Sequence, residues 1–336
     1  MPACDLRIEL FSADGLFRGG DVVEGQVVVE VDSAVRCDKL TIELLWRVHG
    51  YGNRVEQSCE KEVLFSGDWR EGGLHRYRFS LTLPGGPLTF HGTLVNVAWL
   101  LRARADVPWA IDPKAESDLV VERGPLPALA GGTTLPNRGD WSKLIGGAFL
   151  VLSLPLWGMG LFAGGHLLLA DEPRGVVVVV LALFPLLLLL WAFRRPLRRF
   201  AAGRKIGRLK TVLSSECLSA GEPFTVAVRF KARSDLSINH IEVGLHGTEV
   251  ATSGSGTNSS TRRHTFYEET FPVAGSRRIR GGRLVSERVS ITAPDLTAVP
   301  MSLEVRDNAI RWKVTVGVDI RDWPDYEQDT VVLLGD

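Results

Sequence analysis

Apolar and polar residues alternate with a period of two over several stretches near both ends of the chain. The clearest stretches are residues 77–83 and 99–106 in the first part, and residues 224–231 and 312–321 in the last part. This period is that of a β-strand with one face on a core and the other in water. Gly, Pro and Asp separate the stretches, so the sequence predicts two mainly β, immunoglobulin-like sandwiches.

Two long stretches between these regions carry no charge. Residues 144–170 and 176–193 would form helices about 40 Å and about 27 Å long, and a bilayer core of about 30 Å needs around 20 apolar residues. A buried hairpin in a soluble core would keep a polar face, and these stretches have none. The sequence therefore predicts two transmembrane helices joined by a short external loop at residues 171–175.

Basic residues flank this hairpin on one side. Orientation follows the basic residues close to the membrane, which predicts that both large domains and both termini are cytoplasmic. The 31 Arg against 8 Lys favour a bacterial inner or plasma membrane. The basic segment at residues 194–210 contains Arg194, Arg195, Arg198, Arg199, Arg204, Lys205, Arg208 and Lys210.

The overall net charge of zero hides an uneven distribution. Residues 1–143 sum to −4 and residues 211–336 to −3, whereas the basic segment alone carries +8. Neutrality gives no support for a nucleic-acid partner. The basic segment is expected either to contact anionic lipid headgroups or only to set topology.

A second basic group has three possible interpretations: contact with the membrane, contact with an acidic partner, or a solvated loop. It comprises Arg277, Arg278, Arg280 and Arg283.

Within the first predicted membrane helix, Gly160 and Gly164 have the G-x-x-x-G spacing that allows two helices to approach closely. They either pack the hairpin helices together or reflect only the glycine content of this stretch.

The two soluble parts resemble each other. Residues 99–121 align with 312–332: each has a strand led by Trp, then a Trp/Pro break, an acidic turn and a Val-Val strand. The predicted organisation is a sandwich at residues 1–124, a linker at 125–143, the hairpin with its basic segment, and a second sandwich at 211–336.

A recurring pattern in residues 79–106 points to a family. A strand ends in Leu-Pro, a second Pro and a hydroxyl residue follow, and then come a Gly and an aromatic-led strand. The matching positions are Leu83, Pro84, Pro87, Thr89, Gly92, Trp99 and Ala103, with a looser match at Pro294, Pro300, Ile310, Trp312 and Val314. This pattern resembles the arrestin-like superfamily. The resemblance implies paired sandwiches that act as an adaptor or scaffold. The Pro-Pro-x-Tyr motif by which some members recruit ubiquitin ligases is missing from the chain.

Catalytic motifs are missing from the sequence as well. There is no C-x-x-C pair, no H-E-x-x-H, no G-x-S-x-G and no phosphate-binding glycine loop, so no catalytic, cofactor-binding or metal residue is predicted. His240 and His246 share a strand face, which more often carries no ligand. The expected function is that of a membrane-anchored adaptor that binds an unidentified protein. The alternatives are a lipid-facing enzyme with a non-local active site, or an accessory subunit of a transporter or envelope complex.

Overall fold

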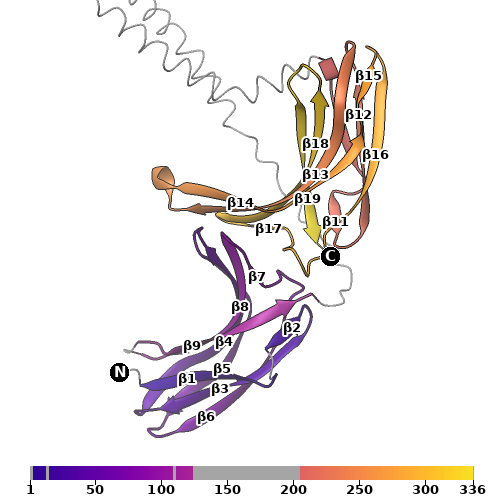
Figure 1. Ribbon diagram of the computed structural model, residues 1–336. Coiled ribbons are helices and arrows are strands. Elements are labelled where there is room, and N and C mark those ends of the chain that lie inside the picture. Colours follow the sequence, from indigo (N-terminus) through magenta and orange to yellow (C-terminus); the bar gives the residue numbers. More distant parts are fainter. Residues whose placement is uncertain (1–2, 13–14, 109–110, 124–204, 336) are drawn as a thin grey trace, which may run out of the picture.

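The computed structural model describes residues 3–12, 15–108, 111–123 and 205–335. These residues form a mainly β structure with two halves (Figure 1), as the alternating pattern predicts. Both predicted membrane helices, Gly160, Gly164 and the linker lie outside the described residues. In the part that is described, no helix has the length and apolar character needed to cross a membrane.

The described N-terminal half contains two sheets. Their orders are β1-β3-β6 and β2-β9-β8-β4-β5, with β7 added to β8. The strands are β1 (Cys4–Leu10), β2 (Leu16–Arg18), β3 (Val22–Val31), β4 (Val35–Gly50), β5 (Val55–Trp69), β6 (Leu74–Thr82), β7 (Phe90–His91), β8 (Val95–Asp106) and β9 (Lys114–Glu122).

The C-terminal half repeats this arrangement. Its sheets have the orders β10-β12-β16 and β11-β19-β18-β13-β14, with β15 added to β13 and β17 to β18. The elements are β10 (Lys210–Leu213), β11 (Cys217–Ser219), β12 (Pro223–Lys231), β13 (Leu236–Ser253), the 3₁₀ turn η1 (Gly256–Asn258), β14 (Ser260–Ala274), β15 (Arg277–Ile279), β16 (Leu284–Thr292), β17 (Leu303–Val305), β18 (Asn308–Ile320) and β19 (Tyr326–Gly335).

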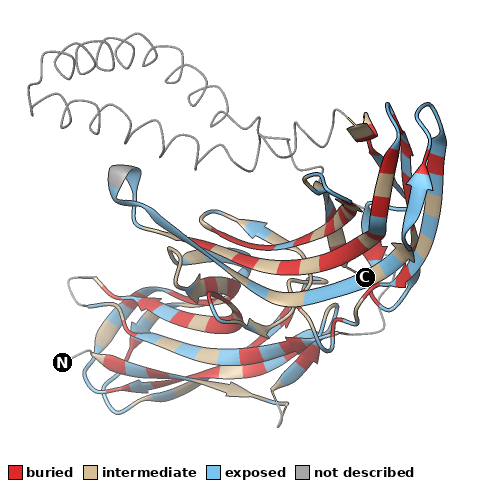
Figure 2. Ribbon diagram, turned by 45° about the horizontal axis from the view of Figure 1, so that its top comes forward, coloured by how far each residue is buried: buried red, intermediate tan, exposed pale blue. Residues whose placement is uncertain are grey.

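Each half has its own hydrophobic core, made by the inward residues of the alternating strands. Along β8, Trp99, Leu101 and Ala103 are fully buried, and along β18 Trp312 and Val314 are fully buried. Figure 2 shows this alternation of buried and more exposed residues along the long strands. Burying a large apolar side chain contributes about 1.5–3 kcal/mol, so these inward rows hold the sheets together.

The internal repeat extends to individual hydrogen bonds. The Trp99 indole donates to the Pro87 carbonyl at 2.6 Å, and the Trp312 indole donates to the Pro300 carbonyl at 3.1 Å. Two residues after each Pro, a hydroxyl accepts a backbone N–H of the last strand. These pairs are Thr89 with Val121 and Ser302 with Leu334. The repeated Pro and hydroxyl positions thus fasten the segment before the Trp strand to the last strand.

The pairing corrects one detail of the sequence alignment. Trp99 pairs with Leu119 and Trp312 pairs with Val332. The counterpart of Val332 is therefore Leu119, and the Val-Val dipeptides that the sequence aligned are offset by two residues. Position along the sheet is set by the ladder hydrogen bonds, which residue type alone does not reveal.

Candidate functional site

A buried carboxylate joins the two halves. Glu249 lies on β13 and is only 1% exposed. Its oxygens accept backbone N–H groups of Thr93 at 3.2 Å, Leu94 at 2.5 Å and Val95 at 3.0 Å, all from the N-terminal half. Gly92 precedes this loop, and a side chain there would collide with the carboxylate. Three donors offset the cost of burying a charge, so this contact fixes the loop against β13.

A second polar contact surrounds the turn between β4 and β5. Asn53 donates to Asp307 at 3.0 Å and to the Gly254 carbonyl at 2.9 Å, and the Asn308 side chain donates to the Asn53 carbonyl at 2.7 Å. Arg262 lies over the Tyr51 ring, 4.2 Å from its centroid. The N-terminal half is therefore held by the tip of the β13–β14 hairpin, where β13 ends and β14 begins, and by the turn before β18.

Apolar contacts complete this interface and leave a groove beside it. Ala251 and Ile310 of the C-terminal half belong to the N-terminal core, and Phe266 packs against both cores. The groove has a volume of about 420 Å³, and Arg123 and Asp295 form an ion pair of 3.1 Å at its edge. Both halves contribute its lining, which consists of residues 87–91, 97, 120–123, 296–301, 303 and 310.

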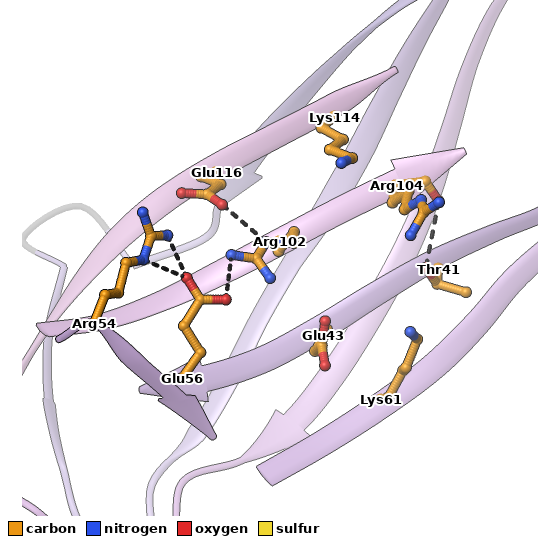
Figure 3. A pocket seen from close by; sticks show the side chains of 9 residues that line it. All are labelled: Thr41, Glu43, Arg54, Glu56, Lys61, Arg102, Arg104, Lys114 and Glu116. Carbon is orange, nitrogen blue, oxygen red and sulfur yellow. Dashed lines mark hydrogen bonds and ion pairs between the residues drawn. The ribbon is translucent and has the colours of Figure 1, made fainter. Parts of the chain in front are cut away.

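A charged face covers the outer side of the β5-β4-β8-β9 sheet. Arg47 and Arg102 each bond both Glu56 and Glu116, at 2.8–3.0 Å, and so form a closed ring of alternating charge. Beside the ring, a hollow of about 270 Å³ opens among charged side chains that point toward one another (Figure 3). Its lining comprises Thr41, Glu43, Arg54, Glu56, Lys61, Arg102, Arg104, Lys114 and Glu116.

The ring controls the ionisation of its carboxylates. Partial burial by itself would raise the pKa of Glu56, but hydrogen bonds from Arg54, Arg102 and Arg47 outweigh it and lower the pKa to about 2. The pKa of Glu116 is likewise lowered, because hydrogen bonds from Arg47 and Arg102 exceed the opposing effect of burial. These carboxylates stay ionised and bonded to Arg, so they are unsuited to proton transfer near neutral pH.

No metal-binding cluster of His, Cys, Asp and Glu occurs in the described parts of the chain. His240 lies 3.4 Å from Asp319 and 3.5 Å from Glu242, whereas His246 contacts Glu268 at 3.8 Å. The two His are six positions apart along one strand, a distance of about 20 Å. The structure thus does not bring them to one site.

The cysteines divide into two kinds. Cys4 and Cys37 are fully buried, and burial is the main reason that the pKa of each thiol rises to about 11. Cys59 and Cys217 are exposed. All four are free thiols.

Of the predicted lipid-contact residues, Lys205, Arg208 and Lys210 lie in the described part of the chain. Arg194, Arg195, Arg198, Arg199 and Arg204 lie outside it. Ile206 and Leu209 are buried in the C-terminal core, and Lys210 begins β10, so this end of the basic segment is already part of the sandwich. The second basic group is not a simple loop either, because Arg277 and Arg278 belong to β15.

Sequence reasoning missed the interface and the charged face. Glu249 is in phase with the inward residues Ile241, Val243 and Leu245 of β13, and a carboxylate at an inward position was the signal that could have revealed it. Arg47, Glu56, Arg102 and Glu116 are distant in the sequence. Neither a protein-family model nor a curated protein matches the chain. No comparison therefore adds to the geometry of these surfaces, and a functional assignment must be argued from that geometry.

Replacing Glu249 with Gln should loosen the interface. One accepting oxygen becomes an NH₂ group, so at least one buried N–H loses its partner at a cost of about 1–3 kcal/mol. Amide exchange of residues 92–95, followed by mass spectrometry on the full chain, should accelerate about tenfold or more. Glu242→Gln, whose side chain is half-exposed on the same strand, is the control. Unchanged exchange in Glu249→Gln would show that the carboxylate does not hold the halves together.

Replacing Glu56 with Gln should reduce stability at neutral pH by about 1–3 kcal/mol. Because the folded pKa is depressed, the contribution of Glu56 is present above its unfolded pKa of about 4.3 and is lost as pH falls towards 2. Urea unfolding across this range should therefore be less pH-dependent in the variant. Glu62→Gln on the same strand should match the unmodified protein. If the unfolding free energy of Glu56→Gln varied with pH in parallel with that of the unmodified protein, the ion-pair interpretation would be contradicted.

Proposed function

We propose that the chain is a membrane-anchored, non-enzymatic adaptor with two arrestin-like β-sandwiches. The observation that carries the proposal is the interface built on Glu249, Asn53 and Asn308, because it combines two sandwiches into one unit with a shared groove. A groove lined by both halves is typical of sites that bind another molecule. The repeated Pro and hydroxyl contacts support the arrestin-like assignment, since they occupy the positions that carry the resemblance.

The membrane anchor in this proposal is the uncharged pair of stretches at residues 144–170 and 176–193, which the chain inserts between the two sandwiches. The loop between them has five residues, so both sandwiches are placed on the same side, in the cytoplasm. The adaptor would thus hold its protein partner close to the bilayer.

The rival proposal of an enzyme lacks a specific observation in its favour. Its signature would be a cleft in which a carboxylate meets a His. His240 does lie near Asp319 and Glu242, but its side chain is 48% exposed and it lines neither the groove nor the charged hollow. Glu56 and Glu116, the carboxylates of the ring, are bonded to Arg.

The anchor predicts an asymmetric topology. A reporter inserted at Arg174 should be active outside the membrane, and a reporter fused after Asp336 should be active inside, because the loop and the C-terminus would lie on opposite sides. Reporter activity on the same side at both positions would contradict the hairpin.

The adaptor proposal predicts that a partner depends on the groove. Ala298 is exposed at the groove, so Ala298→Arg places a bulky charge there without disturbing either core. Crosslinking in native membranes, with quantitative mass spectrometry of the purified full chain, should recover a protein whose yield falls at least about tenfold in this variant, equivalent to about 1.4 kcal/mol. Ala34→Arg, on an exposed turn of the N-terminal half, should leave the yield unchanged. Identical recoveries from both variants would contradict a groove-bound partner.

A further inference from the structure

The fold brings two basic groups that are far apart in the sequence to one end of the C-terminal half. This basic end consists of residues 205–210, 231–235, 277–283 and 321–325, and it lies around β15 at the extremity of the half (Figure 1). The Arg233 N–H donates to the Lys205 carbonyl at 2.8 Å, and the Ala232 N–H donates to the Arg283 carbonyl at 3.1 Å. The Arg321 N–H donates to the Ser237 carbonyl at 2.9 Å, which joins the fourth segment to the same end.

These segments carry ten basic and three acidic residues. One of the acids, Asp235, already accepts the Gly281 N–H at 2.8 Å. Arg277 is neutralised by Glu287 at 2.6 Å, but Arg278, Arg280 and Arg283 are exposed. The surplus of positive charge is therefore presented to solvent.

The internal repeat provides a comparison within the same molecule. In the N-terminal half, Val31 exchanges the same pair of hydrogen bonds with Gly72 and Gly73 that Ala232 exchanges with Gly282 and Arg283. Val35 pairs with Trp69 as Leu236 pairs with Ile279. Residues 30–34 and 67–73 are thus the structural counterparts of residues 231–235 and 277–283.

Charge is what differs between these counterparts. The N-terminal turns contain one basic and four acidic residues, whereas the C-terminal turns contain six basic and one acidic residue. Both sets make the same backbone hydrogen bonds, so the fold does not require the basic residues. The basic residues occur in the C-terminal turns and not in their N-terminal counterparts. This difference is explained if the C-terminal turns bind an anionic ligand.

Two apolar side chains accompany the charge. Trp323 is 39% exposed, and its ring lies 4.5 Å from the Lys205 ammonium. Leu284 is 66% exposed directly after the basic turn. A basic surface with an exposed Trp and an aliphatic side chain matches the interface of a bilayer, where Trp is enriched and Arg meets phosphate oxygens.

The position of the basic end in the chain favours the same ligand. Eleven residues, 194–204, separate Lys205 from the uncharged stretch at 176–193. Even a fully extended segment of that length spans only about 40 Å. If that stretch crosses the membrane, the basic end is tied close to the bilayer surface.

We infer that the basic end of the C-terminal half binds the anionic lipid headgroups of the membrane that anchors the chain. The inference rests on the proposed membrane anchor and adds residues 231–235, 277–283 and 321–325 to the predicted contact. Headgroup binding would fix the orientation of the paired sandwiches, and so of the groove, relative to the bilayer.

The test places an environment-sensitive fluorophore at the basic end of the full chain. Leu284→Cys is labelled with a nitrobenzoxadiazole dye after Cys59→Ser and Cys217→Ser, because Cys4 and Cys37 are fully buried. The protein is placed in nanodiscs of phosphatidylcholine alone or with phosphatidylglycerol. The dye should become brighter and blue-shifted only in the anionic discs. Raising salt from about 0.1 M to about 1 M should reverse the change, because it shortens the screening length from about 10 Å to about 3 Å.

Charge reversal provides the matched comparison. R280E/R283E should weaken the lipid-bound state at least about thirtyfold, since each lost basic residue removes about 1 kcal/mol, 1.4 kcal/mol is a factor of ten, and the two new carboxylates are repelled by the anionic surface. R70E/R76E changes the net charge equally on the N-terminal half, where Arg70 is the counterpart of Arg280, and should have no effect. Circular dichroism checks that both variants are folded.

Several outcomes would overturn the inference. Equal dye spectra in the two lipids would do so while leaving the anchor in place, as would an unaffected R280E/R283E variant. A response to soluble heparin but not to anionic discs would assign the basic end to another polyanion. A chain that stays outside the discs would contradict the anchor instead, and vesicles of the two lipid compositions would then test the basic end with the same label.

Discussion

The way the two described halves pack together depends first on one buried carboxylate. Glu249 gives up its hydration to accept three backbone N–H groups from the loop before β8. A buried charge is tolerated only where such donors are in place, and the donors in turn need an acceptor. Each half therefore satisfies polar groups of the other, and Gly92 keeps the space that the carboxylate occupies. The shared groove exists because this contact fixes the two sandwiches side by side.

The two halves share a backbone plan but differ in their surface charge. The Trp-to-Pro and hydroxyl contacts recur almost atom for atom, which indicates that these residues serve the fold. The outer sheet of the N-terminal half carries the Arg–Glu ring, and the turns at the end of the C-terminal half carry exposed Arg. Where equivalent positions keep their hydrogen bonds and change their charge, the change reflects the surroundings of each half. Under the proposed anchor between the halves, those surroundings would differ most in their distance from the membrane.

The proposed adaptor and the proposed headgroup contact are separate statements about one geometry. The groove concerns what the pair of sandwiches binds, and the basic end concerns how the pair is oriented. A rigid interface connects them, because a surface fixed at one end of the C-terminal half then determines the direction in which the groove faces. The Arg–Glu ring stands apart from both, since its charges satisfy one another and hold four strands of a single sheet together.

The sequence by itself determined several of the strands, such as β8 and β18, with their inward faces, and the repeat, because a period of two and the burial of apolar side chains are local properties. It predicted Trp99 and Trp312 as equivalent, and it located the basic residues by number. Which distant segments meet was decided only by the tertiary structure. Glu249 occupies an inward position of β13, but only the fold brings the loop at Thr93–Val95 to it. Arg280 and Lys205 are 75 positions apart until β12, β13 and β15 bring them to one end. Hydrogen bonds and charges act through space, so the partners of these groups depend on long-range pairing that no local pattern records.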